Sequence, residues 1–162
     1  MAASNQLSTQ VIGAAGELLV QYQLLKHGID SARLTTDSGI DLVMYVPGTS
    51  EAFTVQVKAI GQPFPDGSPT CPITVGWSLP RTCKAQWLAG VDISRDMVWL
   101  FRIEEALQLA KGNTADVFLY WRLQPNPRGR IESETAFEQY RFDNVIASIV
   151  AEAIADDALG DS

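Results

Sequence analysis

Three residues with chemically useful side chains lie close together between positions 38 and 60. Asp41 is near the start of an apolar segment, and Gln56 and Lys58 are two positions apart in the next one. A carboxylate and an amide oxygen are hard ligands that suit Mg²⁺ or Mn²⁺. An ammonium group beside such an ion can orient water or stabilise negative charge that develops on a phosphate. The set indicates a metal-assisted phosphoryl site if the fold brings the three side chains together.

The segments that carry these residues are predicted to form a β-hairpin. Residues 40–46 and 52–60 are rich in strand-forming side chains, and a Pro-Gly-Thr-Ser turn separates them. Centring that turn pairs Asp41 with Gln56. Directly paired residues share a face of the sheet, and Lys58, two positions after Gln56, lies on the same face. A slip of one residue in the pairing would place Asp41 on the opposite face of the sheet from Gln56 and Lys58.

The motifs Gly39-Ile40-Asp41-Leu42 and Val55-Gln56-Val57-Lys58 follow one another in this hairpin. They resemble the D…(E/Q)xK core of the PD-(D/E)xK nuclease superfamily, as a D…QxK variant. Within that superfamily, the motifs are most similar to those of the Holliday-junction-resolvase and Mrr-like restriction endonuclease group. In that group an upstream helix carries a Glu in a G-x-x-G-E context, and Gly13-Ala14-Ala15-Gly16-Glu17 is similar to it. The resemblance covers about residues 10–60.

The resemblance implies a role for each of five residues. Asp41 would bind a divalent ion, Mg²⁺ or Mn²⁺, and Glu17 would complete the metal shell. Gln56 would supply a side-chain oxygen and Val57 its backbone carbonyl. Lys58 would position the attacking water or stabilise the developing charge. The implied function is a metal-dependent endonuclease that hydrolyses DNA phosphodiester bonds.

The same residues also have non-catalytic interpretations. Asp41 and Lys58 could form a structural ion pair, and Glu17 could lie on a solvated helix face. Gly13 and Gly16 could mark tight helix–sheet packing instead of the close approach of a ligand. Gln56 replaces the acid that many relatives carry, which lowers the negative charge of the site. The alternative function is therefore a catalytically degenerate nuclease-fold binding or interaction module.

A helix is predicted from about residue 9 to residue 27. Ser8 or Thr9 would cap its start, and Gly28 would end it. Apolar residues at helical spacing predict its buried stripe, namely Val11, Ala15, Leu18, Tyr22 and Leu25.

The remaining elements are predicted from periodicity and from turn residues. They are a loop at 61–72, a further strand of the hairpin sheet at 73–79, a short helix at 80–89, strands at 97–103 and 117–123 with a helix at 104–111 between them, a loop at 124–130 and a helix from Glu138 onward. The last helix would pack on its own sheet or, alternatively, form the face of a homodimer.

Four basic residues are the candidate contacts to DNA. Arg81 and Lys84 would share one face of the short helix, and Arg128 and Arg130 lie in the second loop. A solvated surface is the other interpretation of each pair. The chain has 19 acidic and 12 basic residues, a net charge of −7, so only weak general affinity for DNA is expected.

Length and composition predict one α/β domain over residues 1–162, with a core at about 8–155 and an acidic tail at 156–162. The expected architecture is a mixed central β-sheet, with the hairpin carrying the site and helices flanking the sheet. The resemblance to the nuclease superfamily implies that this architecture is restriction-endonuclease-like. Two cysteines, no secretory signal and no membrane-length apolar run predict a cytoplasmic protein with reduced thiols and no membrane partner.

Overall fold

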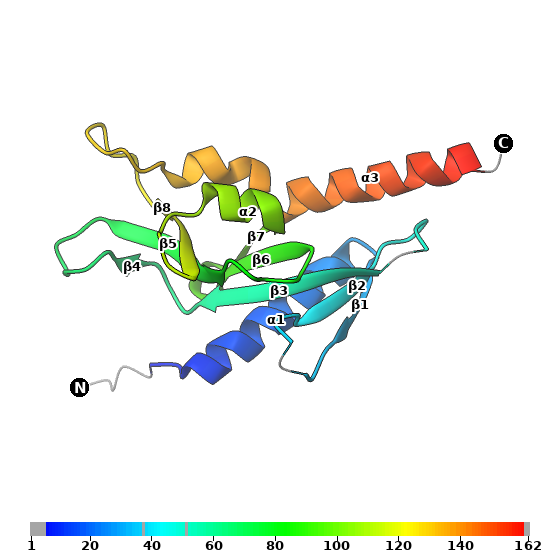
Figure 1. Ribbon diagram of the computed structural model, residues 1–162, viewed down its shortest axis with the longest axis horizontal. Helices are drawn as coiled ribbons and strands as arrows, with labels where there is room; N and C mark the ends of the chain where they lie inside the picture. Colours follow the sequence, from blue (N-terminus) through cyan, green and yellow to red (C-terminus); the bar gives the residue numbers. More distant parts are fainter. Residues whose placement is uncertain (1–5, 37, 51, 161–162) are drawn as a thin grey trace.

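The described residues form two β-sheets and the helices that cover them (Figure 1). The computed structural model describes residues 6–36, 38–50 and 52–160. The elements run in the order α1 (Thr9–Lys26), β1 (Asp30–Arg33), β2 (Leu42–Tyr45), β3 (Ala52–Ile60), β4 (Phe64–Pro65), β5 (Ile73–Pro80), β6 (Trp87–Asp92), η1 (Ile93–Arg95), β7 (Met97–Arg102), α2 (Ile103–Leu109), β8 (Asp116–Arg122), η2 (Glu134–Tyr140) and α3 (Phe142–Gly160).

The larger sheet is the mixed central sheet that the sequence predicted. Its strand order is β1-β2-β3-β6-β7, in which β3 and β6 pair in parallel and the other neighbours are antiparallel. The smaller sheet has the order β4-β5-β8 and is antiparallel. The described residues therefore make a mixed α/β fold, as expected.

Alternating side chains on β7 define the layers. Val98 and Leu100 belong to a core that includes residues of α1 and α3. Trp99 and Phe101 point to the opposite face and pack with residues of β5, β8, α2 and η2. The central sheet therefore lies between two helices on one face and the smaller sheet with α2 and η2 on the other.

Three tryptophans fill the second core. The rings of Trp77, Trp99 and Trp121 have centroids 5.1–5.7 Å apart in tilted and edge-to-face arrangements. Gly90 admits them, because a Cβ at that position would lie 2.7 Å from the ring of Trp77. This packing fixes the smaller sheet against β6.

The hairpin register agrees with the prediction. Leu42 pairs with Val55, so the next pair outward sets Asp41 opposite Gln56. The strand β3 begins at Ala52 and ends at Ile60, as predicted.

Three predictions for the middle of the chain are wrong. The strand predicted at 73–79 exists, but it belongs to the smaller sheet and not to the hairpin sheet. Residues 80–89 form no helix, because β6 begins at Trp87 after an irregular segment. All six residues of β6 are buried, so no alternation of exposure distinguishes it from a buried helix. The loop predicted at 61–72 contains β4, which pairs with β5.

The predicted buried stripe of α1 is also wrong. The buried residues of the helix are Gly16, Val20 and Leu24, whereas Leu18 and Tyr22 are exposed. Gly16 explains the choice of face, because an added Cβ would lie 2.7 Å from the Cβ of Ala59 in β3. Only glycine lets the helix approach the strand this closely.

The C-terminal helix packs on its own sheet. Phe142, Ile146 and Ala153 are buried in the first core, whereas Ile154 is exposed. The helix continues to Gly160, through most of the segment predicted as a tail. None of the helices in the described residues has the length and apolarity needed to cross a membrane.

The two glycines of α1 offer a matched test of this packing. Gly13→Ala should stabilise the protein by about 1 kcal/mol, since nothing lies within 4 Å of the new Cβ and alanine favours the helix. Gly16→Ala should lower the free energy of unfolding, because overpacking costs about 1–3 kcal/mol. Urea denaturation of both variants measures the difference, and equal effects would contradict the close contact.

Candidate active site

Asp41 lies where β2 and β3 separate. Its backbone N–H donates to the carbonyl of Val55 at 2.9 Å, and the regular pairing ends there. Its Oδ2 then accepts from the backbone N–H of Val57 at 2.7 Å and from Nε2 of Gln56 at 2.5 Å. The carboxylate thus takes the place of the backbone acceptor that Val57 lacks beyond the end of the ladder.

Gln56 is buried beside this carboxylate, with 7% of its surface exposed. Its Oε1 faces Gly39, where an added Cβ would lie 3.4 Å away, and Gly39 has a left-handed φ of 72°. The left-handed φ favours glycine at this position. The bonds from Gln56 and Val57 both reach Oδ2 of Asp41, so Oδ1 is the oxygen left for a ligand.

Lys58 lies on the same face of β3 as Gln56, opposite Gly90 of β6. It is half-buried and forms no ion pair with Asp41, so the expected structural ion pair is not present. Its charge still lowers the pKa of Asp41, which requires the two groups to be near each other. The ammonium is therefore near the carboxylate without being bound to it.

Glu17 reaches the site from α1, held by a residue that the sequence analysis did not single out. Its Oε2 accepts from Nε of Arg33 at 2.7 Å and from Nη2 at 2.6 Å. The solvated face proposed for Glu17 is not observed, since only 21% of the side chain is exposed. Arg33 pairs with Leu42 across β1 and β2, one residue from Asp41. The pairing of β1 with the hairpin brings Arg33 to this position.

The environment raises the pKa of Asp41 above its ordinary value. Burial is the largest cause, and the nearby charge of Glu17 adds to it. The bond from Val57 and the charges of Lys58 and Arg33 act in the opposite direction. A cation placed at this carboxylate would favour its charged form.

The oxygen atoms available here suit a magnesium-like ion. They are Oδ1 of Asp41, Oε1 of Gln56 and the carbonyl of Val57, which receives only a long 3.4 Å bond from Gln56. No group of three His, Cys, Asp or Glu side chains in the described residues could hold a metal by itself. Mg²⁺ commonly binds one or two carboxylates and takes its other ligands from water and phosphate, so the donor set fits. Both bonds from Arg33 reach Oε2 of Glu17, so Oε1 is the oxygen through which Glu17 could join.

The basic residues proposed to contact DNA do not form one surface. Arg81 lies on no helix, and its guanidinium donates to the carbonyls of Gly112 at 2.6 Å and Thr114 at 3.0 Å. Arg128 and Arg130 are exposed in the segment after β8. That segment follows the Arg122 end of β8, whereas Arg81 follows the opposite end of the smaller sheet.

Lys84 is exposed and lies near the hairpin. It precedes Gln86, whose backbone N–H donates to the carbonyl of Thr54 at 3.1 Å. Gln86 Oε1 also accepts from the backbone N–H of Thr54 at 2.9 Å. Thr54 is two residues before Gln56 on β3, so Lys84 is the basic candidate that the topology brings toward Asp41.

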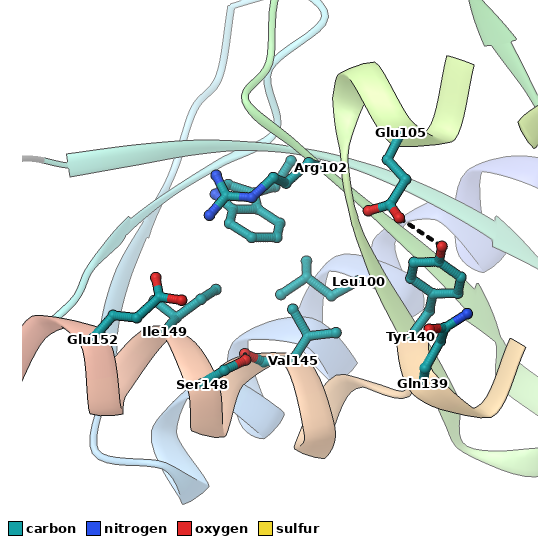
Figure 2. A pocket seen from close by; sticks show the side chains of 10 residues that line it. Leu100, Arg102, Glu105, Gln139, Tyr140, Val145, Ser148, Ile149 and Glu152 are labelled. Carbon is teal, nitrogen blue, oxygen red and sulfur yellow. Dashed lines mark hydrogen bonds between the residues drawn. The ribbon is translucent and has the colours of Figure 1, made fainter. Parts of the chain in front are cut away.

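A separate hollow of about 280 Å³ lies between α3, β7 and α2 (Figure 2). Arg102 stacks over the ring of Trp87 at 4.7 Å, and the Tyr140 hydroxyl donates to Glu105 at 2.6 Å. Burial and this bond raise the pKa of Tyr140 to about 12. None of the predicted site residues lines the hollow, so it does not contribute to the site at Asp41.

Comparison with known proteins identifies the fold. No protein-family model and no curated protein sequence matches the chain. Among solved structures, the bacterial homing endonuclease I-Ssp6803I is similar with a TM-score of 0.64 and 17% identity, over 95% of this chain and 99% of that one. Archaeoglobus fulgidus Hjc, a Holliday junction resolvase from an archaeal hyperthermophile, has a TM-score of 0.44 and 14% identity, over 65% of this chain and 81% of that one.

The chain has a restriction-endonuclease-like fold. This confirms the architecture expected from the motif. Within this restriction-endonuclease-like domain, the D…QxK residues lie where β2 and β3 separate, and the charge of the helix Glu acts on Asp41. Their chemical roles remain predictions.

The raised pKa of Asp41 predicts a pH-dependent effect of Asp41→Asn without metal. The Asp41 carboxyl binds a proton more tightly in the folded state than in the unfolded chain. The free energy of unfolding therefore falls as the pH rises from below the ordinary pKa of 3.8 through the raised pKa of the folded state. The amide oxygen of Asn can still accept from Val57. The variant should match the wild type near pH 3 and have the higher Tm near pH 8, measured by calorimetry with EDTA. A lower Tm near pH 8 would show that the charge is stabilising.

Proposed function

We propose that the protein is a metal-dependent endonuclease that hydrolyses DNA phosphodiester bonds. The observation that carries the proposal is the meeting of the Asp41 carboxylate with Gln56 and Val57, beside Lys58. The fold, similar to that of a homing endonuclease, supports a nuclease over other metal-dependent enzymes. DNA is accordingly the proposed substrate, and Mg²⁺ or Mn²⁺ the proposed cofactor.

Each residue of the proposed site has a distinct role. Asp41 holds the divalent ion, with Gln56 and Val57 supplying neutral oxygens. The ion, when bound, supplies positive charge against the phosphate and lowers the pKa of coordinated water. Lys58 stabilises the negative charge that the phosphate gains during hydrolysis. Glu17 joins the ion through Oε1 while its Oε2 stays with Arg33.

The proposed DNA contacts are few, because the protein is acidic. Of the four basic candidates, Lys84 is the one that the topology brings toward the site, and Arg128 and Arg130 would make a separate contact from the loop after β8. Phosphate contacts made by a few cations give weak binding that falls as salt increases. DNA binding is therefore best measured at low ionic strength.

Cleavage should require a divalent ion and the charged groups of the hairpin. Asp41→Asn and Lys58→Met should each lower the cleavage rate about 100-fold or more, since each removes a charge that acts on the reacting phosphate. The measurement is cleavage of linear, branched and single-stranded DNA at low salt with Mn²⁺. EDTA should abolish cleavage.

Matched substitutions in the smaller-sheet region provide the control. Asp116→Asn and Lys111→Met change the same side-chain types at exposed positions and should leave cleavage unchanged. Cleavage that survives Asp41→Asn would reject the proposed site, even if the protein is a nuclease.

Gln56→Glu tests the metal site without relying on activity. The substitution replaces the N–H donor to Asp41 with a second carboxylate, so it should lower the metal-free stability by about 1–3 kcal/mol. A bound divalent ion should reverse the loss, because two carboxylates would then share it. Chemical denaturation with EDTA and with Mn²⁺ measures both effects.

Gln86→Glu is the matched control for that experiment. Gln86 uses its Oε1 to accept from Thr54, and a carboxylate keeps this acceptor. Its stability should change little and should not depend on Mn²⁺. If Gln56→Glu shows no metal-dependent gain, the divalent ion does not bind at Asp41.

A nuclease-fold binding module that cleaves nothing is the second candidate. One observation favours it: each carboxylate has partners within the protein, Asp41 in Gln56 and Val57, and Glu17 in Arg33. Calorimetric titration of Mn²⁺ into the wild type and Asp41→Ala discriminates the two. Absence of metal binding and of cleavage on every DNA form would favour the module.

A further inference from the structure

A groove of about 830 Å³ lies where the start of α1 meets the end of β3 and the strand β4. In Figure 1 the first turns of α1 (blue) lie below the end of β3. The groove has apolar walls and neutral polar groups, supplied by Ile12, Ile60, Phe64, Gln6, Thr9 and Gln62. None of the residues that line it within the described part of the chain is charged, although 19% of the chain is charged. The groove therefore suits a neutral group that is largely apolar and has polar edges.

The groove begins next to the proposed active site. Ile60 follows Lys58 by two residues on β3, so both side chains lie on the same face of the strand. On α1, Gly13 lies one turn before Glu17, and nothing lies within 4 Å of the place that a Cβ of Gly13 would take. The two elements that carry Lys58 and Glu17 thus both lead from the site into the groove.

Phe64 extends the groove onto the outer face of the smaller sheet. It pairs with Thr74 of β5, which pairs with Arg122 of β8, so the three side chains share one face. Phe118 and Tyr120 lie on that face as well, because they alternate with core residues along β8. The surface that continues from the groove is therefore aromatic.

Two of these rings are available to a ligand. The ring centroids of Phe64 and Phe118 are 6.3 Å apart, and both side chains are half-buried. Tyr120 packs against Phe118 at 5.2 Å and already has the ammonium of Lys111 5.7 Å from its ring centroid. The β5 residues on this face are the small Thr74, Gly76 and Ser78. A face that joins aromatic rings to small residues differs from the aliphatic faces that pack in the two cores.

A nucleobase combines the properties that the groove and the rings require. It is flat and uncharged, it stacks on aromatic side chains whatever its sequence, and its edges bond to amide and hydroxyl groups. Bases within a continuous duplex are already paired and stacked, so only an unpaired base reaches the rings without a further cost. We propose that the groove and the rings of Phe64 and Phe118 bind unpaired bases of the DNA strand whose phosphate lies at Lys58.

This binding rests on the proposed nuclease function and names its substrate class. The substrate is DNA that is single-stranded next to the cleaved phosphate. Phe64 follows Lys58 by six residues, which span at most about 22 Å, so a short unpaired segment connects the two. The neutral lining also matters in an acidic protein, because the bases enter the groove without bringing their phosphates against a carboxylate there.

DNA binding without metal tests the proposal separately from cleavage. Fluorescence anisotropy at low salt in EDTA compares three ligands: a blunt duplex, the same duplex with a single-stranded tail, and a four-way junction in which every base is paired. The tailed duplex should bind at least about 5-fold more tightly than the other two, since each stacked base contributes that factor or more. Equal affinities for the three ligands would overturn the proposal.

Substitution of the rings locates the binding. Phe64→Leu and Phe118→Leu remove a ring and keep an apolar side chain, so each should weaken binding of the tailed duplex about 5-fold and leave the blunt duplex unchanged. Tyr22→Leu removes a ring that is 59% exposed on α1, outside the groove, and should change neither affinity. A preference for the tail that survives both Phe substitutions, or that Tyr22→Leu abolishes, would contradict the assignment.

A photochemical cross-link identifies the contact in the wild type, so it does not depend on the folding of a variant. Iododeoxyuridine in the tail, next to the duplex, should attach to Phe64 or Phe118, as mapped by mass spectrometry of the digested complex. Attachment only at residues remote from the groove would overturn the proposal. If the protein cleaves DNA but binds the tail no better than the duplex, this proposal fails and the nuclease function stands. A preference for the tail without any cleavage would support the groove and reject the nuclease.

Discussion

The bond from the backbone of Val57 to the carboxylate of Asp41 is the interaction on which the site depends. The ladder between β2 and β3 ends just before it, so the N–H needs an acceptor from a side chain. Asp41 meets that need, and the same bond fixes the carboxylate beside Gln56. A requirement of strand geometry thereby orients the group that is proposed to hold the metal. One arrangement of Asp41 thus accounts both for its bond to the backbone of Val57 and for its proposed role as a metal ligand.

Charge balance explains how this arrangement exists in an acidic protein. Two carboxylates, Asp41 and Glu17, face two cations, Lys58 and Arg33. Without metal the four groups partly compensate one another, yet burial keeps the pKa of Asp41 raised. A divalent ion would offset that burial, and a phosphate would offer Lys58 a partner. The two cations therefore do not fully offset the burial of Asp41, and the site favours a further cation.

The sequence predicted the hairpin well because its information is local. The Pro-Gly turn set the register, and the motif residues follow from it. The sequence could not show which of two apolar faces of α1 would be buried, since only the contact of Gly16 with Ala59 decides it. Arg33 was missed because its partner, Glu17, is on another element. The smaller sheet was missed because strand patterns do not show which sheet a strand joins, and Trp87–Asp92 is buried on both faces.

A crystal soaked in Mn²⁺ tests the central claim most directly, because anomalous scattering locates the ion independently of activity. The account predicts one anomalous peak within coordination distance of Oδ1 of Asp41 and of the carbonyl of Val57, with the Gln56 amide turned so that Oε1 faces the ion. The ion–oxygen distances should be close to those of a hard divalent cation. No peak at saturating Mn²⁺, with Nε2 of Gln56 still donating to Asp41, would contradict the account.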